Sequence, residues 1–286
     1  MSRVFSSFLL LFVLISNTVL AGGFDAAKLE TVLASQPEAV QARYSSRHPA
    51  ETLKFFGVAP GMTVVEALPG GGWYTKILLP YLGQEGALIG ADYSTEMYPL
   101  FGFFNEEQLK KKDTWVQDFT ADATGWAGDD GAPVTAFVLG DLPEEMKGTA
   151  DTVLFIRALH NLARFESQGG FLTAALQNAF DILKPGGTVG VVQHLARDEM
   201  SDEWAGGQNG YLKESFVSLK MKLAGFEFVG SSDINENPKD QPTDQDIVWR
   251  LPPSLATSRE NPELKAEMEA VGESNRMTLK FRKPRE

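Results

Sequence analysis

Three consecutive glycines, Gly70, Gly71 and Gly72, stand between a short apolar run and a segment with helical character. Glycines let a backbone approach a ligand closely and adopt positive φ angles. The N-terminus of the following helix would offer unpaired N–H groups to an anionic moiety. This pattern predicts a ligand-binding turn, and its alternative is a tight turn that binds nothing.

Two acidic residues follow apolar runs and could bind the sugar and base of a nucleoside. Asp92 lies 22 residues after Gly70, and a carboxylate there can accept hydrogen bonds from both ribose hydroxyls. Asp141 ends the next apolar run and could reach an adenine amino group. In the alternative interpretation Asp92 caps the following helix and Asp141 is a turn residue.

Two of the three histidines, His160 and His194, follow the fourth and fifth apolar runs. An unperturbed imidazole titrates near neutral pH, which makes these two residues candidates for a general base. Both could instead be structural. Asn161 and Tyr211 are weaker candidates for orienting a substrate.

Several kinds of chemistry are excluded by what the sequence lacks. There are no cysteines, so disulfides, thiol nucleophiles and zinc–thiolate sites are ruled out. No histidine or carboxylate pattern predicts a metal site, and no G-x-S-x-G element predicts a serine hydrolase. A G-x-G-x-x-G dinucleotide fingerprint would need a third glycine where Thr75 stands. These features alone leave a nicotinamide and an S-adenosylmethionine site both open.

The elements that would position these residues alternate along the chain. Apolar runs at 62–67, 87–92, 134–141, 150–156 and 188–194 are separated by helical segments, which predicts a parallel sheet covered on both faces. The segments 226–231 and 276–282 add two strands, and the polar–apolar alternation of 276–282 predicts a half-exposed strand at or near the sheet edge. The expected fold is α/β, a Rossmann-like, doubly wound, seven-stranded sheet.

The flanking segments are expected to have separate roles. Residues 1–21 combine Arg3, an apolar run at 8–15 and small residues at a cleavage site, which predicts a signal peptide and a periplasmic or secreted protein. Residues 22–60 are expected to form an N-terminal helical lid outside the core, before an α/β domain at 61–286. The polar segment 235–275 is expected to be an irregular insertion before the last strand.

The net charge of the chain limits the classes of binding partner that we expect. The formal net charge of −12 disfavours nucleic acid and anionic lipid. No stretch after the first 21 residues is apolar enough for stable membrane insertion. A small-molecule substrate is therefore expected, and the sequence carries no signal for an oligomeric state.

Longer strings resemble an exported, little-characterised branch of the class I S-adenosylmethionine-dependent methyltransferases. They are HPAETLKFFGV (48–58), PGMTVVEALPGGGWYTKILLPYLG (60–83), ALHNL (158–162), LKPGGTVGVVQH (183–194), INENPKD (234–240) and ESNRMTLKFRKP (273–284). The resemblance implies a class I methyltransferase fold that ends in an antiparallel hairpin. It also implies a cofactor set of Glu66, Gly70, Gly71, Gly72, Asp92 and Asp141, with the loop 158–161 facing cofactor and substrate.

The glycine turn departs from the general methyltransferase pattern. Leu68 stands at the position of the first glycine, and Pro69 follows it. The leading hypothesis is a methyltransferase for an unknown small molecule or envelope component. The alternatives are a non-catalytic protein that binds an adenosyl ligand, and an NAD-dependent oxidoreductase on a similar fold.

Overall fold

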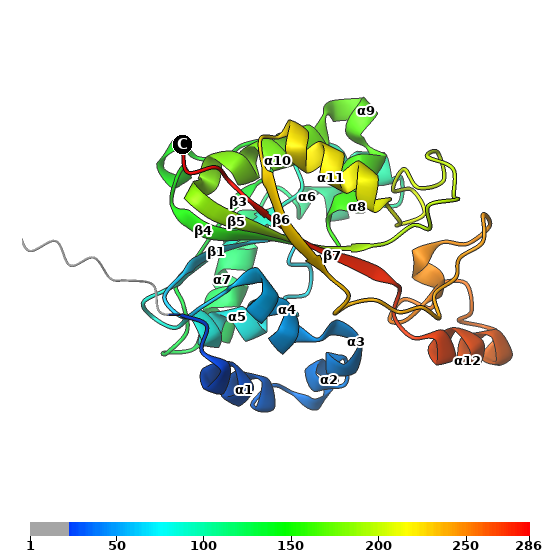
Figure 1. The fold of residues 1–286 in the computed structure, drawn as a ribbon, viewed down its shortest axis with the longest axis horizontal. Helices are drawn as coiled ribbons and strands as arrows, with labels where there is room; N and C mark the ends of the chain where they lie inside the picture. Colours follow the sequence, from blue (N-terminus) through cyan, green and yellow to red (C-terminus); the bar gives the residue numbers. More distant parts are fainter. Residues whose placement is uncertain (1–22) are drawn as a thin grey trace, which may run out of the picture.

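A computed structural model describes residues 23–286, which form one seven-stranded sheet with helices on both faces (Figure 1). The expected signal peptide, residues 1–21, lies outside the described residues. Among the residues that are described, no helix is long and apolar enough to cross a membrane. The strand order is β3-β2-β1-β4-β5-β7-β6. Strands β1 to β5 pair in parallel, whereas β7 is antiparallel to both β5 and β6.

The strands fall close to the expected apolar runs. They are β1 (Thr63–Ala67), β2 (Ala87–Asp92), β3 (Val134–Val138), β4 (Ala150–Ile156), β5 (Leu183–His194), β6 (Glu227–Ser232) and β7 (Arg276–Arg282). Most residues of β1, β2, β4 and β5 are buried, which explains why these strands read as nearly continuous apolar runs. The seven-stranded α/β fold predicted from the sequence is therefore confirmed.

Helices cover the sheet in two layers (Figure 1). One layer holds α1 (Ala26–Ala34), α4 (Pro49–Phe56), α5 (Thr75–Leu82) and α7 (Trp115–Ala127). The other holds α8 (Leu159–Arg164), α10 (Phe171–Ile182) and α11 (Glu214–Leu223). The remaining helices are α2 (Glu38–Gln41), α3 (Tyr44–Arg47), α6 (Glu106–Lys110), α9 (Glu166–Gly169) and α12 (Pro262–Val271), with 3₁₀ turns η1 (Thr95–Phe101), η2 (Glu144–Met146) and η3 (Val248–Arg250).

The N-terminal helices belong to the core, and the expectation that they pack outside it is wrong. Leu29 on α1 and Leu53 and Phe56 on α4 are at most 1% exposed. They pack with residues of β1 and α5 in one apolar cluster. Burial of these side chains from water holds α1 and α4 against the sheet. Only the short α2–α3 stretch between them remains beside the carboxyl ends of the strands.

Strand β7 lies one position in from the edge, between β5 and β6, and is mostly buried. Its polar residues Arg276, Thr278 and Lys280 face the N-terminal helices and the segment before α12, and only Arg282 at its end is exposed. Lys280 donates through Nζ to the carbonyl of Phe55 (3.1 Å), and the Thr278 hydroxyl accepts from Asn235 Nδ2 (3.0 Å). The prediction that this strand is half-exposed is therefore wrong, because the N-terminal helices and the segment before α12 cover most of its polar face.

Two helical regions differ from the sequence-based expectation. The helical segment expected between the second and third apolar runs is divided into η1, α6 and α7. The segment 235–275, expected to be irregular, contains α12. This helix begins with Pro262 in its first turn, and its cap Asn261 accepts from the Leu264 amide (3.1 Å). Asparagine followed by proline is a helix-start signal, so the sequence carried the information.

Candidate functional site

A cavity of about 800 Å³ opens at the carboxyl ends of β1, β2, β4 and β5. The sheet order reverses direction between β1 and β4, and ligands in open α/β sheets bind at such a point. Residues from the β1 turn, the end of β2, the end of β4 and the end of β5 line it together. The topology thus brings six of the sequence-predicted residues together there: Gly70, Gly71, Asp92, His160, Asn161 and His194.

The turn after β1 brings Gly70 and Gly71 to the cavity wall. A Cβ added at either glycine would meet no atom within 4 Å, so the backbone faces open space there. Gly72 has another role, because a Cβ at this residue would lie 2.4 Å from the Trp126 ring. Leu68 adopts φ 56°, the left-handed region that favours glycine. Leucine therefore stands at a position whose backbone conformation favours glycine.

Glu66 lies beneath this turn and does not line the cavity. It is 4% exposed, and its Oε2 accepts a hydrogen bond from Thr75 Oγ1 (2.6 Å) at the start of α5. Burial raises the pKa of Glu66 to about 7. The contact fixes the end of β1 against α5, which gives Glu66 a positioning role for the turn.

Asp92 ends β2, whereas Asp141 lies in the turn after β3, and the two residues have different surroundings. Asp92 is buried in the cavity wall, where it accepts from the Tyr98 hydroxyl and from the Tyr93 amide (2.9 Å). Burial raises the pKa of Asp92 above its ordinary value. Asp141 is exposed and lies outside the cavity lining. The turn before it is held toward α10 by a hydrogen bond from the Gly140 amide to Asn178 Oδ1 (2.7 Å).

His160 and His194 both line the cavity, with ring centroids 5.4 Å apart. His160 Nδ1 contacts Gln193 Oε1 (3.3 Å), and His194 Nδ1 contacts Ser274 Oγ (2.5 Å). An amide oxygen only accepts, so Nδ1 of His160 carries the proton and Nε2 keeps its lone pair. Burial lowers the pKa of His160 to about 4 and that of His194 well below its ordinary value. Both rings are neutral at pH 7.

The two predicted substrate residues are separated by the structure. Asn161 lines the cavity and donates through Nδ2 to the Tyr93 hydroxyl (2.9 Å), while its buried Oδ1 has no partner in the described part of the chain. Tyr211 is fully buried outside the cavity lining. Its hydroxyl contacts Asp240 Oδ2 (3.0 Å) and accepts from Arg250 Nη1 (2.8 Å), which makes it part of a packed polar cluster.

Three arginines line the cavity and were missed by the sequence analysis. Arg43 and Arg47 come from the α2–α3 stretch, and Arg157 directly follows β4. The Arg47 guanidinium lies 4.5 Å from the Trp73 ring centroid, a cation–π contact. Arg157 adopts φ 58°, which is unfavourable for any residue with a side chain. The loop expected at 158–161 is the start of α8, and the position of Arg157 directly before it was the available signal.

A single carboxylate, Glu273, lies behind these arginines. It accepts from Arg43 Nη2 (2.5 Å), Arg47 Nε (3.2 Å) and Arg276 Nη1 (3.2 Å). Burial would raise the pKa of Glu273, but the surrounding guanidinium groups outweigh burial and hold the pKa below its ordinary value. The group is therefore an ionised carboxylate at neutral pH, shared by three cations.

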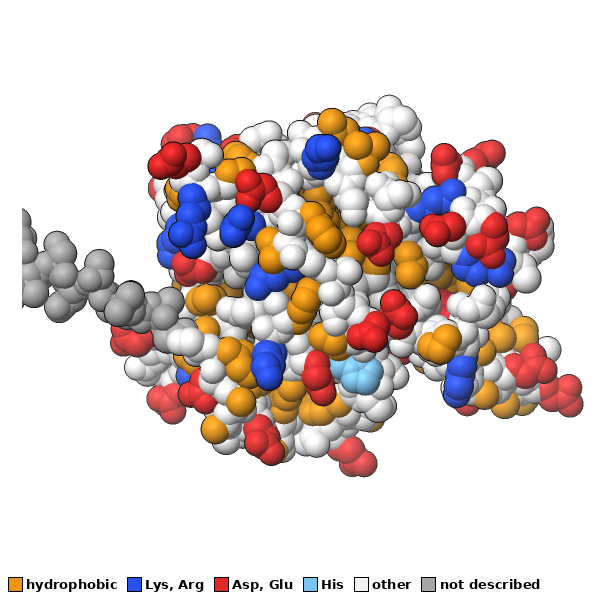
Figure 2. Space-filling view, in the orientation of Figure 1, with side chains coloured by type: hydrophobic (Ala, Val, Ile, Leu, Met, Phe, Trp, Pro, Cys, Tyr) orange, Lys and Arg blue, Asp and Glu red, His pale blue; other side chains and the backbone are white. Residues whose placement is uncertain are grey.

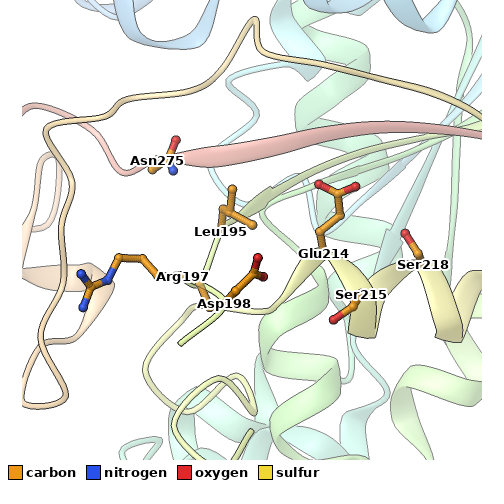
Figure 3. Close-up of a pocket in the computed structure, with 8 residues that line it drawn as sticks. Leu195, Arg197, Asp198, Glu214, Ser215, Ser218 and Asn275 are labelled. Atoms are coloured by element: carbon orange, nitrogen blue, oxygen red, sulfur yellow. The ribbon is translucent and has the colours of Figure 1, made fainter. Parts of the chain in front are cut away.

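A second hollow, of about 510 Å³, lies between the end of β5 and the start of α11 (Figure 3). Asp198 and Glu214 bring two carboxylates to it, and none of the residues predicted from the sequence lines it. Within residues 23–286, no group of three histidine, aspartate or glutamate side chains is arranged to hold a metal ion. The larger cavity is therefore the candidate site.

Comparisons with known proteins agree on the architecture. No protein-family model and no curated protein matches the sequence. Among solved structures, a geranyl diphosphate methyltransferase in complex with SAM has a TM-score of 0.51 at 16% identity, over 92% of this chain and 96% of that one. Geranyl diphosphate C-methyltransferase from Streptomyces coelicolor A3(2) has a TM-score of 0.51 at 16% identity, over 92% and 90%.

A third similar structure, the [4+2]-cyclase SpnF, has a TM-score of 0.52 at 16% identity, over 84% of this chain and 80% of that one. At such identities a likeness carries the fold and not the reaction, and the cyclase illustrates the difference. The sheet topology, with parallel strands β1 to β5 and an antiparallel β7, supports the same fold assignment. The chain has the Rossmann-like fold of the class I methyltransferases.

Proposed function

We propose that the protein is an S-adenosylmethionine-dependent methyltransferase that acts on a small-molecule or envelope acceptor outside the cytoplasm. The observation that carries the proposal is the meeting of the open glycine turn and the buried carboxylate of Asp92 in one cavity. The signal-like sequence at 1–21 supports export, and the acidic composition argues against a nucleic-acid acceptor.

The residues around the cavity fit the proposed cofactor. Gly70 and Gly71 leave room for its amino-acid part beside the backbone. Asp92 Oδ1 and Oδ2 each accept one hydrogen bond in the protein, and a carboxylate has about four acceptor positions, so both oxygens retain capacity for ribose hydroxyls. Buried polar atoms without a partner among the described residues, Trp73 Nε1 and Asn161 Oδ1, also belong to this wall.

S-adenosylmethionine, when bound, would supply a methyl group on a sulfonium cation for in-line transfer. The protein's own contribution is alignment and exclusion of water. The aromatic rings of Trp73 and Tyr93 line the cavity and suit a cation. Asn161 is fixed by its bond to Tyr93, so its free Oδ1 offers a fixed acceptor for a substrate N–H or O–H.

His160 is proposed to orient the acceptor, with His194 beside it. A histidine with a pKa of about 4 accepts hydrogen bonds at neutral pH without becoming charged. As a general base it is weak, which favours an acceptor that loses its proton late, as the new bond to the methyl carbon forms. The same weakness also supports a second candidate, a protein that binds an adenosyl ligand without turnover.

The oxidoreductase alternative is disfavoured by two observations. The third glycine of a dinucleotide fingerprint is replaced by Thr75, whose hydroxyl is committed to Glu66. The seventh strand is antiparallel between β5 and β6, whereas the dinucleotide-binding fold has the strand order 3-2-1-4-5-6 without this insertion.

The first experiment is calorimetric titration of the purified protein with S-adenosylmethionine, S-adenosylhomocysteine and NAD. We expect micromolar binding of both adenosyl ligands and none of NAD. Asp92→Asn should weaken the affinity for S-adenosylhomocysteine about 10- to 100-fold, because the ribose hydroxyls lose charge-assisted hydrogen bonds. Asp141→Asn is the matched control and should change the affinity less than about twofold, since Asp141 is exposed outside the cavity. Folded protein that binds neither adenosyl ligand would refute the proposal.

Catalytic turnover distinguishes the methyltransferase from a protein that binds the adenosyl ligand without reaction. A mixture of candidate acceptors with labelled S-adenosylmethionine should give labelled product with the wild type. His160→Gln and His194→Asn should reduce kcat while leaving the affinity for S-adenosylhomocysteine unchanged. Cofactor binding without product from any acceptor would favour the binding protein.

A further inference from the structure

The cavity has two chemically different ends, which the strand order keeps apart. Asp92 belongs to β2, on one side of β1, whereas Arg157 follows β4 and His194 ends β5, on the other side. Arg43 and Arg47 approach this second side from the N-terminal helices. We call the group Arg43, Arg47 and Arg157 the arginine end.

The arginine end concentrates positive charge in an acidic protein. Acidic and basic side chains are scattered over the molecular face in Figure 2, and the chain as a whole carries a formal charge of −12. At the arginine end, by contrast, Arg43, Arg47 and the adjoining Arg276 pair with one carboxylate, Glu273, and Arg157 adds a fourth positive charge. This local excess of positive charge favours the binding of an anion.

Two of these guanidinium groups have unused donors. Arg157 makes no side-chain hydrogen bond or ion pair with any residue in 23–286, and its Nε is buried. Arg47 Nη1 is buried without a partner in the same part of the chain. Burial lowers the pKa of Arg157 to about 10 and that of Arg47 to about 9, so both remain charged at neutral pH. A buried, charged donor without an acceptor is unfavourable in the protein alone.

The backbone conformation at Arg157 supports a ligand-binding role for its side chain. Its φ of 58° is adopted by few residues other than glycine, and such conformations gather at ligand sites. Glycine there would relieve the strain and remove a charged side chain whose buried Nε has no partner among the described residues. The sequence instead has arginine, whose planar fork matches phosphate and carboxylate oxygens in pairs.

We propose that the arginine end binds an anionic group, phosphate or carboxylate, of the methyl acceptor. The substrate class is then an anionic small molecule whose reacting atom lies toward His160 and His194. This inference rests on the proposed function. The competing source of the anion is the carboxylate of the cofactor, because Trp73, which contacts Arg47, directly follows the glycine turn.

The test is calorimetric titration of the full protein with pyrophosphate and with malonate, in chloride-free buffer, without and with saturating S-adenosylhomocysteine. We expect at least one anion to bind, with an affinity that S-adenosylhomocysteine does not weaken. Arg157→Gln should weaken anion binding at least tenfold and leave the affinity for S-adenosylhomocysteine within about twofold. The control is Arg282→Gln, because Arg282 is an exposed residue of β7 that pairs with Glu227 of β6. This variant should bind the anion like the wild type.

Three results would overturn the inference. The first is that neither anion binds the folded wild type. The second is competition between the anion and S-adenosylhomocysteine. The third is an Arg157→Gln variant that loses affinity for S-adenosylhomocysteine but not for methylthioadenosine, which lacks the amino-acid part. Because the anion titration is also run without the adenosyl ligand, failure of cofactor binding remains distinguishable from failure of this inference.

Discussion

The two ends of the cavity bury ionisable groups of opposite kinds. Beside β1 and β2 these are the acids Glu66 and Asp92, whose pKa values burial raises. Beside β4 and β5 they are His160, His194, Arg47 and Arg157, whose pKa values burial lowers. Both ends therefore carry groups whose charged forms are disfavoured in the free protein, and such perturbed groups gather at functional sites. The acidic side suits hydroxyl donors, and the basic side suits an anion.

Removal of the shared carboxylate should give the largest effect on stability. Glu273→Gln leaves several buried guanidinium groups without a counter-charge, which should lower the free energy of unfolding by about 3–5 kcal/mol. Urea denaturation at pH 7.5 measures the change. Glu227→Gln breaks an exposed pair with Arg282 and should cost less than about 1 kcal/mol. Equal losses in the two variants would show that the arginine end is not electrostatically special.

The acidic side should gain stability when Glu66 becomes neutral. The folded state keeps the proton of Glu66 up to about pH 7, while an unfolded chain releases it near pH 4.5. The stability contributed by this group is thus complete below pH 4.5 and lost as the pH rises to 7, a difference of about 3 kcal/mol. Glu66→Gln should therefore be more stable than the wild type at pH 8 and lose this advantage at pH 4.5. A pH-independent difference would contradict the buried acid.

The histidines should show the opposite slope. His160 is neutral in the folded state down to about pH 4, while the unfolded chain binds a proton below about pH 6.5. Stability is then complete above pH 6.5 and falls by about 2 kcal/mol between pH 6.5 and pH 5. His160→Gln should remove this share of the acid sensitivity, whatever its effect at pH 7.5. Unfolding free energies of both proteins at pH 7.5 and 5.0 provide the comparison, and an unchanged slope would contradict it.

The smallest effect is expected from Arg157→Gly. Glycine removes a left-handed strain of about 1–2 kcal/mol and a charged side chain with an unpaired, buried Nε, but it adds about 0.5–1 kcal/mol of entropy to the unfolded chain. We expect a gain of about 1 kcal/mol in stability, measured by urea denaturation. Arg157→Ala removes the same charge and keeps the strain, so it should be less stable than the glycine variant. The reverse order would show that the backbone is not strained.

The sequence predicted the acidic side better than the basic side, for a physical reason. Gly70, Gly71 and Asp92 stand at the ends of consecutive strands, so periodicity and spacing alone bring them together. Asp141 has the same kind of position but turns away, because the loop after β3 is bonded to α10. That bond joins residues 38 positions apart and leaves no local signal.

The arginine end depends on contacts that no local pattern encodes. Arg47 reaches the cavity only because α1 and α4 pack on the sheet, and Tyr211 is kept out because Arg250 and Asp240 enclose its hydroxyl. Other elements that were not predicted do have a recognisable sequence pattern. Helix α7 carries Trp115, Phe119 and Ala123 four residues apart on one face, an amphipathic pattern that the sequence analysis passed over.

The antiparallel insertion of β7 makes the site depend on nearly the whole length of the chain. Arg43 and Glu273 are separated by 230 positions and meet only when the last strand lies between β5 and β6. A product truncated before residue 273 would hold the acidic side complete, yet its guanidinium groups would face one another without their carboxylate. Like-charge repulsion would then oppose closure of the N-terminal helices over the sheet. The charges of Arg43 and Arg47 are therefore balanced only once β7 has paired between β5 and β6 and brought Glu273 beside them.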